Sequence, residues 1–512
     1  MRTSVRPLHR VAWLAALAAL TTLTTAGCAV GPDFKAQAPA APPSFADWHG
    51  GSPALVPPQA RADAAAAPAG WAMFGDTVLD ALEARALAAN ADLQTAALHF
   101  LQSRAQRSAV ASQAVPQLNA SAGVTRLRQS ENGETKRLLD AFNPPNQAQL
   151  IQVLSEPHDF YQAGFDASWE LDLWGRVRRS VESADANVGA SQALLAQTQL
   201  SVQAEVARRY FELRAAQRQI SIARDDIASA EETLELVKAR ADGGLTTDLD
   251  VTRQNAQAAD LRARLPPLLA QEAQATNQIT LLLGERPGAL QSQLAARPDA
   301  ASAVALPDLS LGLPSDMALR RPDIQVAQAQ LHAATASIGV AVADLYPRIT
   351  IGAGFGFQSV DGSTFTDWGS RQWSIGPSLQ LPIFDGGRRR ATVTLRELQQ
   401  QEAAVAYQQT VLKAWHEIDD ALSAYSAERL RNIQLAERER SSRDALQLAR
   451  VRYDHGLTDF LVQLDAQRTW LQAQREYTES TSRLALGLVA VSKALGGAGD
   501  LPAKAGAAPS AG

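Results

Sequence analysis

Few residues in this chain are suited to chemistry. The seven histidines are scattered, without the spacing that would place metal ligands on a shared face. The sequence has no phosphate-binding loop, no cysteine pair and no serine in a strand-turn-helix setting that would make it a nucleophile. We therefore expect no enzyme, no metal site and no cofactor beyond a covalent lipid, so energy for any transport has to come from a partner.

The single cysteine, Cys28, is the exception. It follows Ala26 and Gly27, which come after a basic start and an apolar run from Val11 to Leu23. This order is typical of a secretory signal, and the run is too short to span a bilayer. The sequence therefore predicts a signal peptide over residues 1–27, with Cys28 either lipidated or incidental. The site resembles a bacterial lipobox, which implies a lipid on Cys28, and Ala29 after it implies the outer membrane.

Composition favours long helices over several compact cores. The 512 residues are 46% hydrophobic, 6% aromatic and 20% charged, and Ala and Gln are abundant. The formal net charge of -5 excludes nucleic acid as an expected partner. Residues 28–70 are Ala- and Pro-rich and predict an extended N-terminal tether, and residues 497–512 predict a disordered tail.

One stretch occurs twice at a constant shift. Arg240-Ala-Asp-Gly-Gly-Leu-Thr corresponds to Arg452-Tyr-Asp-His-Gly-Leu-Thr, and the same shift places Leu283-Gly284 on Leu495-Gly496. The chain is therefore a duplication, with repeats over 71–300 and 301–496. Each copy predicts a helical hairpin, with tips at 240–251 and 452–465, in which Gly ends one helix and Thr caps the next.

Four stretches alternate apolar residues with polar residues or Gly, which predicts strands near 118–126, 160–173, 348–358 and 372–384. The pattern suits an outer-membrane barrel, and it also suits a half-buried sheet in a soluble protein. In lipid, four strands would leave backbone groups unpaired, so several chains would have to share one barrel. Three chains would give about twelve strands. The polar connections 126–160 and 359–371 would then face the exterior.

After Trp174-Gly175 the period becomes helical. Apolar residues recur every seven positions from Val206 to Leu234, with small residues between them, and Val411, Ile418 and Tyr425 keep the same step. Each half therefore predicts a helix of about 65 residues, roughly 100 Å long. Such helices could build a solid coiled-coil stalk. The scarcity of large apolar residues favours a hollow tube.

Several spaced motifs now carry a family resemblance: the Cys28 to Phe34 stretch, Trp71-x-x-Phe74-x-Asp76, Arg321-Pro-Asp-Ile324, Tyr346-Pro347 and the two Gly-Leu-Thr turns. Together they resemble the TolC-like outer membrane factors, most closely the NodT- and OprM-type lipoproteins of RND efflux pumps.

The resemblance implies a homotrimer: a twelve-stranded outer-membrane β-barrel, four strands per chain, continued by a long periplasmic α-helical barrel. It implies a passive exit channel for drugs or other small molecules, with a periplasmic adaptor, an inner-membrane RND pump and outer-membrane lipid as partners. The alternatives are the duct of a type I protein secretion system, a metal-ion efflux channel or a non-conducting coiled-coil tether.

The same resemblance assigns residues to the tip. Leu461 and Asp465 would form gate rings, and Asp250 and Tyr453 would belong to a latch that holds the closed state. A solvated helix charge is the alternative for Asp465. Adaptor docking would fall to the two turns, for which plain turn chemistry is the alternative: Gly244, Leu245, Thr246, Gly456, Leu457 and Thr458.

Overall fold

The computed structural model describes residues 29–36, 41–56, 70–296 and 320–497. The chain divides into two compact units, each drawn from both repeats. Unit 1 comprises 1–35, 102–188 and 330–403, and unit 2 comprises 36–101, 189–329 and 404–512. The predicted boundary near residue 300 separates the two copies along the chain, whereas the spatial division cuts across both copies. The predicted signal peptide over 1–27, Cys28 and residues 498–512 of the predicted tail lie outside the described residues.

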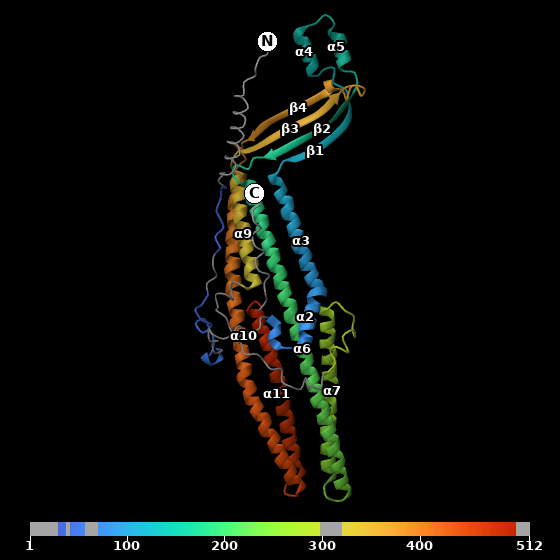
Figure 1. Cartoon of the computed structure of the whole chain (residues 1–512), viewed down its shortest axis with the longest axis vertical. Coiled ribbons are helices and arrows are strands. Elements are labelled where there is room, and N and C mark those ends of the chain that lie inside the picture. The colour runs from blue at the N-terminus through green and yellow to red at the C-terminus, as the bar shows by residue number, and fades with distance from the viewer. Residues whose placement is uncertain (1–28, 37–40, 57–69, 297–319, 498–512) are drawn as a thin grey trace, which may run out of the picture. The chain divides into compact units, whose positions relative to one another are not determined.

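Unit 1 contains one antiparallel sheet in the order β1-β2-β3-β4 (Figure 1). The strands are β1 (Gln117–Leu127), β2 (His158–Glu170), β3 (Arg348–Ser359) and β4 (Arg371–Gln380). The register aligns the apolar residues in rows, because Ala120 lies opposite Phe165, Phe165 opposite Phe355, and Phe355 opposite Trp373. None of the described residues covers this apolar face, and Phe165 and Trp373 are 56% and 70% exposed.

The opposite face of the sheet carries polar residues and glycines. One row aligns Asn119 and Asp166 with Gly354 and Ser374. In the next row, a Cβ added to Gly356 would lie 2.6 Å from the Ala163 carbonyl oxygen. Glycine is therefore needed there for close strand approach, and the two faces of the sheet differ sharply in polarity.

Three details of the sheet region differ from expectation. The second strand ends at Glu170, not near residue 173, because the chain leaves the extended conformation at Asp172, whose φ is 21°. The fourth strand ends at Gln380, not near residue 384, because Gln380 pairs with Arg348, the first residue of β3. Pro347 precedes Arg348 and has no N–H to extend the ladder. The 126–160 connection is also more ordered than the predicted loop, since it contains α4 (Glu134–Phe142) and α5 (Gln147–Leu154).

Two long helices of 67 residues each, α6 (Arg176–Asp242) and α10 (Arg388–Asp454), run through both units. The predicted seam of α6 is buried, with Val206 and Leu213 fully covered. The remaining helices are α2 (Thr77–Ala89), α3 (Ala91–Ala111), α7 (Asp248–Leu282), α9 (Pro322–Ala343) and α11 (Phe460–Ala494), with short 3-10 turns at Pro53–Leu55, Gly70–Phe74, Ser112–Ala114 and Trp368–Ser370.

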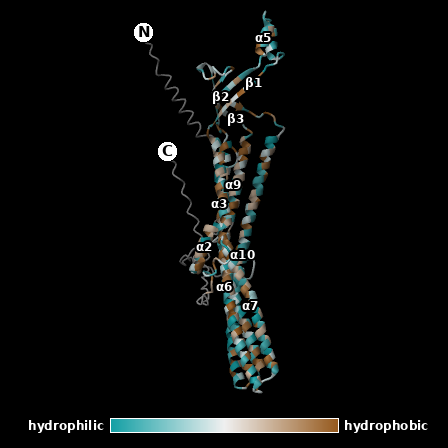
Figure 2. Ribbon diagram, turned by 90° about the vertical axis from the view of Figure 1, so that its right-hand side faces the viewer, coloured by the Kyte–Doolittle hydropathy of each residue, from teal (hydrophilic) through white to brown (hydrophobic). Residues whose placement is uncertain are grey.

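In unit 2, α7 and α11 return alongside α6 and α10 to form two hairpins. Hydrophilic and hydrophobic residues alternate along them (Figure 2). α7 contains Pro266 and Pro267, which α11 lacks at the matching positions. Because proline has no N–H, the carbonyls of Arg262 and Ala263 receive no helical hydrogen bond there. Among the described residues, no helix has the length and apolar character needed to cross a membrane.

The Arg-Pro-Asp-Ile motif ties three helices of unit 2 together. Asp323 lies in the first turn of α9, where the helix dipole favours an acid. The buried guanidinium of Arg321 donates to Asp323 at 2.6 Å and to Glu417 of α10 at 2.6 Å. Its Nη1 also donates to the Ala494 carbonyl at 2.6 Å, at the last residue of α11. These bonds outweigh burial and raise the pKa of Arg321, so it stays charged.

We expect Arg321→Ala to destabilise the protein by roughly 2 kcal/mol, because it removes these bonds while Asp323 and Glu417 remain partly solvated. Arg320→Ala is the matched control, since the neighbouring side chain is exposed. Denaturant unfolding followed by the helical circular dichroism signal measures both variants. Equal midpoints for the two would contradict the role given to Arg321.

Candidate functional site

The two hairpin tips have the same backbone geometry. Gly244 and Gly456 adopt left-handed φ values of 74° and 70°. The next residue closes each turn, since the amides of Leu245 and Leu457 each donate to a helix carbonyl, of Arg240 and Arg452, at 2.8 Å. Glycine is favoured at this position because a side chain would strain it. Both leucines are left in solvent, Leu245 80% and Leu457 68% exposed.

The caps after the turns differ from the prediction. The N-cap is Thr247 in the first hairpin and Asp459 in the second, one residue beyond the expected Thr246 and Thr458. Thr246 instead donates to Asp250 at 2.7 Å. The Oγ1 of Thr458 is buried and has no hydrogen-bond partner among the described residues. The expectation was wrong because each turn holds one more residue than the Gly-Leu-Thr motif.

The carboxylate of Asp250 accepts hydrogen bonds from residues of its own turn. Its carboxylate forms a capping box with Thr247 and lies 3.7 Å from the guanidinium of Arg253. Burial opposes ionisation of Asp250, but the hydrogen bonds from Thr246 and Thr247 outweigh it and lower the pKa. Among the described residues no hydrogen bond joins Asp250 to Tyr453, although Val251, the residue after Asp250, packs against the same buried cluster as Tyr453.

Tyr453 contacts the α6 side of the first hairpin. The guanidinium of Arg240 sits 4.6 Å from the centre of the Tyr453 ring and 3.4 Å from the carboxylate of Asp454. Tyr453, followed by Asp454, raises the pKa of Arg240. Beneath them, Val237, Phe460 and Leu464 form a buried cluster. The two tips are thus tied side by side through α6, α10 and α11.

Leu461 and Asp465 lie four residues apart on α11, on the side away from that cluster. Both are exposed, Leu461 by 49%, whereas Phe460 and Leu464 are buried. Residues at this spacing share one helical face. The face therefore presents an apolar group and a carboxylate together. At the position of Asp465, the first repeat carries Arg253.

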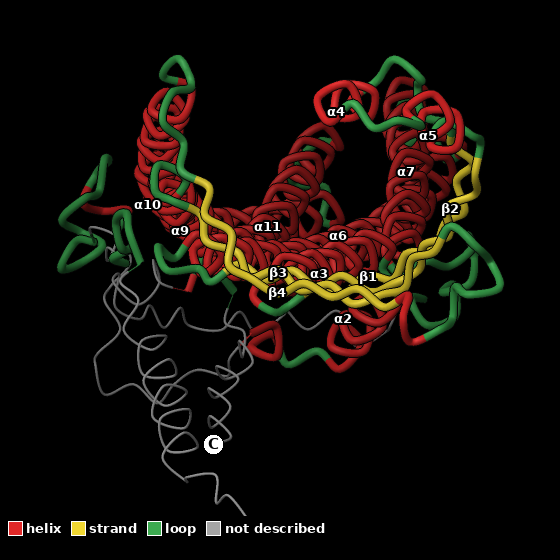
Figure 3. The backbone as a smooth tube through the Cα atoms, turned by 90° about the horizontal axis from the view of Figure 1, so that it is seen from above, coloured by secondary structure: helices red, strands yellow, loops and turns green. Residues whose placement is uncertain are grey.

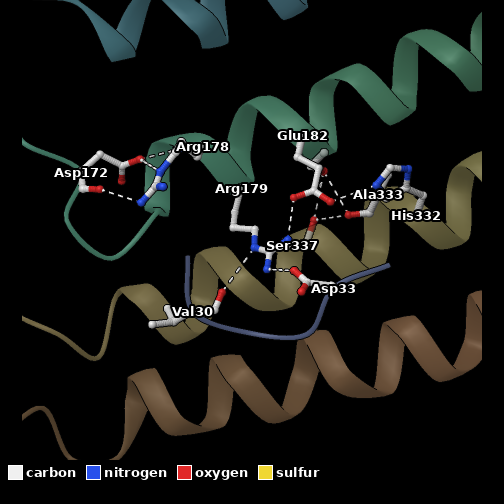
Figure 4. Close-up of polar contacts among 10 residues, drawn as sticks. Val30, Asp33, Asp172, Arg178, Arg179, Glu182, His332, Ala333 and Ser337 are labelled. Carbon is white, nitrogen blue, oxygen red and sulfur yellow. Dashed lines mark hydrogen bonds and ion pairs between the residues drawn. The ribbon is translucent and has the colours of Figure 1, made fainter. Parts of the chain in front are cut away.

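A second site, missed by the sequence analysis, fixes the chain just after Cys28. Residues 29–34, called here the strap, pack on α6 and α9 (Figure 4). The buried Arg179 donates to the Val30 carbonyl at 3.3 Å and to Asp33 at 2.5 Å, and its other nitrogen donates to Glu182. Burial opposes the charge of Arg179, but the bonds that it donates to Asp33 and Glu182 raise its pKa.

Tight contacts complete the strap. A Cβ on Gly31, whose φ is +89°, would lie 2.5 Å from the Gly339 Cα, so the two backbones touch. The Phe34 ring stacks on His332 at 4.3 Å. Ala29 lies against Gly175, just after the end of β2. The Cys28 to Phe34 motif was visible in the sequence, but its partners lie far along the chain.

The next described segment, residues 41–56, is also packed, whereas a free tether was predicted. His49 bonds to Asp419 of α10 at 2.6 Å, and the Trp48 ring meets the Trp415 ring edge-on at 5.6 Å. Aromatic residues within the Ala- and Pro-rich stretch provide these contacts. Over the described ranges, no three His, Cys, Asp or Glu side chains gather as metal ligands.

Comparison with known proteins places these features in a family. The model of the family described as outer membrane efflux protein matches residues 82–285 and 313–497. Outer membrane protein OprJ of Pseudomonas aeruginosa is 34% identical over 485 residues, which cover 94% of this chain and 95% of OprJ. SilC of Salmonella typhimurium, named a probable outer membrane lipoprotein, is 31% identical over 84% of this chain and 88% of SilC.

A solved structure agrees. The outer-membrane channel OprN matches with a TM-score of 0.79 and 33% identity, covering 92% of this chain and 99% of OprN. The predicted resemblance is confirmed. The predicted fold class, four strands per chain in a twelve-stranded barrel continued by a helical barrel, is that of these channels. The protein is an outer membrane exit channel of RND-type efflux pumps. The chain belongs to the outer membrane efflux protein family.

Proposed function

We propose that three copies of this chain form a passive duct that is anchored by a lipid on Cys28 and closed at its periplasmic tips. The open sheet is the observation that carries the proposal. Its edge strands β1 and β4 have no further partner among the described strands, and one of its faces is apolar. Such a sheet is stable in lipid only when neighbouring chains pair with both edges. Drugs or other small molecules are the proposed cargo.

The gate is assigned to Leu461 and Asp465. Three copies of their shared exposed face, turned toward the axis, would stack a ring of leucines on a ring of carboxylates. An apolar ring restricts flow by excluding water, and an acidic ring favours cations. The contact of Arg240 with Tyr453 and Asp454 supports a latch that holds the two hairpins together. Asp250 is kept in this latch, where it also fixes the first turn through its capping box with Thr247.

Asp465→Ala should raise the open probability and lower the cation preference of the channel in planar bilayers, because it removes the charged ring. Arg240→Ala should raise conductance too, by loosening the latch. Its matched control is Arg452→Ala, since Arg452 is the equivalent residue of the second repeat and is exposed. For Asp465→Ala the control is Asp444→Ala, an exposed acid on α10. A correctly inserted trimer whose conductance and selectivity are unchanged in both test variants would reject the gate.

Docking of a periplasmic adaptor is assigned to the two turns. Leu245 and Leu457 are large apolar side chains in solvent at matching positions, which suits an apolar partner surface. Gly244 and Gly456 shape the turns, and Thr246 and Thr458 flank the leucines. The buried, unpartnered hydroxyl of Thr458 supports a contact that the isolated chain lacks.

The double change Leu245→Asp and Leu457→Asp should abolish drug resistance in a deletion strain, because charge would block apolar docking while leaving the turns intact. Leu236→Asp is the control, because Leu236 is also exposed but lies on α6 away from the turn. Drug susceptibility and membrane content are measured together. Full resistance in the double variant would exclude docking through the leucines. Export of a protein substrate, with no drug resistance restored by the parent chain, would favour type I secretion.

The lipid on Cys28 is supported by the position of its neighbour. Ala29 is held against Gly175, and the Val30 amide donates to the Trp174 carbonyl at 3.1 Å. Trp174 lies four residues after the end of the membrane strand β2. An acyl chain on Cys28 would therefore begin beside the membrane boundary. The name of SilC, a lipoprotein, agrees with this assignment.

Cys28→Ser should abolish incorporation of labelled palmitate. Arg179→Ala should keep the label but expose the strap to added protease, because the clamp on Val30 and Asp33 is lost. Arg107→Ala, which removes only an exposed ion pair with Asp185, should leave the strap protected. Label that persists in Cys28→Ser would exclude this anchor, and a protected strap in Arg179→Ala would exclude the clamp.

A further inference from the structure

The connection between β1 and β2 is a folded helical hairpin with an unused apolar face. On α4, Leu138 and Phe142 lie one turn apart and are 60% and 75% exposed. Exposed apolar residues of this size on one helical face usually mark a contact surface. The sheet does not cover this face, although it belongs to the same unit.

The hairpin is fixed well enough to present that face in a defined direction. α4 ends at Asn143 in the left-handed conformation, with its amide bonded to the Leu139 carbonyl at 2.8 Å. Gln147 at the start of α5 donates to Asp140 of α4. At the other end, Arg128 reaches the carbonyl of the buried Ser155 at 3.3 Å. The hairpin is therefore tied both internally and to the end of β1.

The position of the hairpin relative to the sheet indicates what covers the apolar face of α4. Seen from above, the sheet is curved and α4 lies over its concave side (Figure 3). When curved sheets close into a cylinder, the concave side becomes the interior. Membrane lipid contacts the convex side, so α4 projects away from lipid and over the mouth of the barrel.

We propose that the α4 helices of three copies meet through Leu138 and Phe142 and form an apolar collar across the external mouth. The occupant of each exposed face is thus a second copy of this chain. α4 begins at Glu134, a short connection after β1 ends at Leu127. In the proposed barrel β1 is an edge strand that pairs with the neighbouring copy, so the contact continues the interface between subunits. The proposal rests on the three-chain barrel proposed above.

The collar would act in series with the tip. A ring of leucine and phenylalanine side chains excludes water and so opposes the passage of ions and small polar solutes. It carries no charge at the point of contact, unlike the carboxylate ring assigned to Asp465. The channel would then be restricted by charge and apolarity at one end and by apolarity alone at the other.

Cysteine cross-linking tests the collar, since Cys28 is the only cysteine in the chain. The full-length chain carrying Phe142→Cys, in outer membranes, is treated with a short bis-maleimide and analysed by denaturing electrophoresis. A band at twice the mass of the chain is expected. Arg137→Cys is the matched control, because Arg137 is exposed on a different side of the same helix and takes no part in the bonds that fix the hairpin. The parent chain, treated identically, reports any background from Cys28.

The possible outcomes distinguish a failure of the collar from a failure of the three-chain barrel on which it rests. A dimer band for Phe142→Cys, absent for Arg137→Cys and unchanged on dilution in detergent, supports the collar. A monomer band for Phe142→Cys in a particle of trimer mass contradicts the collar but agrees with the three-chain barrel. Protection of that cysteine from a water-soluble maleimide, without cross-linking, overturns it in favour of a lipid contact. A particle of monomer mass removes both proposals.

As a functional measurement, Leu138→Ser with Phe142→Ser should raise conductance several-fold over Asp465→Ala alone when placed in that background. The polar replacements leave the hairpin bonds of Asp140 and Asn143 in place. Unchanged conductance in the combined variant, at equal trimer content, would show that the mouth is not restricted by these side chains.

Discussion

The constraint on which the rest of this structure depends is backbone hydrogen bonding in an apolar solvent. An unpaired amide or carbonyl inside a bilayer costs several kcal/mol, so a sheet with open edges cannot remain alone there. The four strands of this chain have such edges at β1 and β4, together with one mainly apolar face. Subunit association is thus a condition of membrane insertion, and the long helices inherit the same threefold arrangement because α6 and α10 begin shortly after β2 and β4.

Because the chain is a duplication, its two hairpin tips have similar backbone geometry, but sequence differences between the two copies make the tips unequal. Both turns use a left-handed glycine and expose a leucine. Around them the copies differ: the first repeat places Arg253 where the second has Asp465, and only the first turn has a complete capping box. In the first hairpin Asp250 is bound within its own turn, whereas in the second Asp465 is exposed. A ring of six hairpins therefore contains two kinds of hairpin, and only the second-repeat kind can turn the carboxylate of Asp465 toward the axis.

Local patterns predicted the local structure well. Period-two alternation located the strands, and the Gly-Leu-Thr repeat located the turns, because both signals are contained within a few residues. Two of the errors arose where a distant partner decides the outcome. The fourth strand stops where Pro347 ends its neighbour, and the strap is held by Arg179, far along the chain. The contact of Arg240 with Tyr453 joins the two repeats, and no pattern within one repeat contains it.

The paired prolines of α7 have a mechanical consequence. Two adjacent backbone hydrogen bonds are missing at Pro266 and Pro267, whereas the matching stretch of α11, at Thr478 and Glu479, retains its amides. A helix bends most readily where its ladder is interrupted. The hairpin of the first repeat is therefore the more flexible of the two. A sideways force on the turns would bend α7 in its middle before it bent α11.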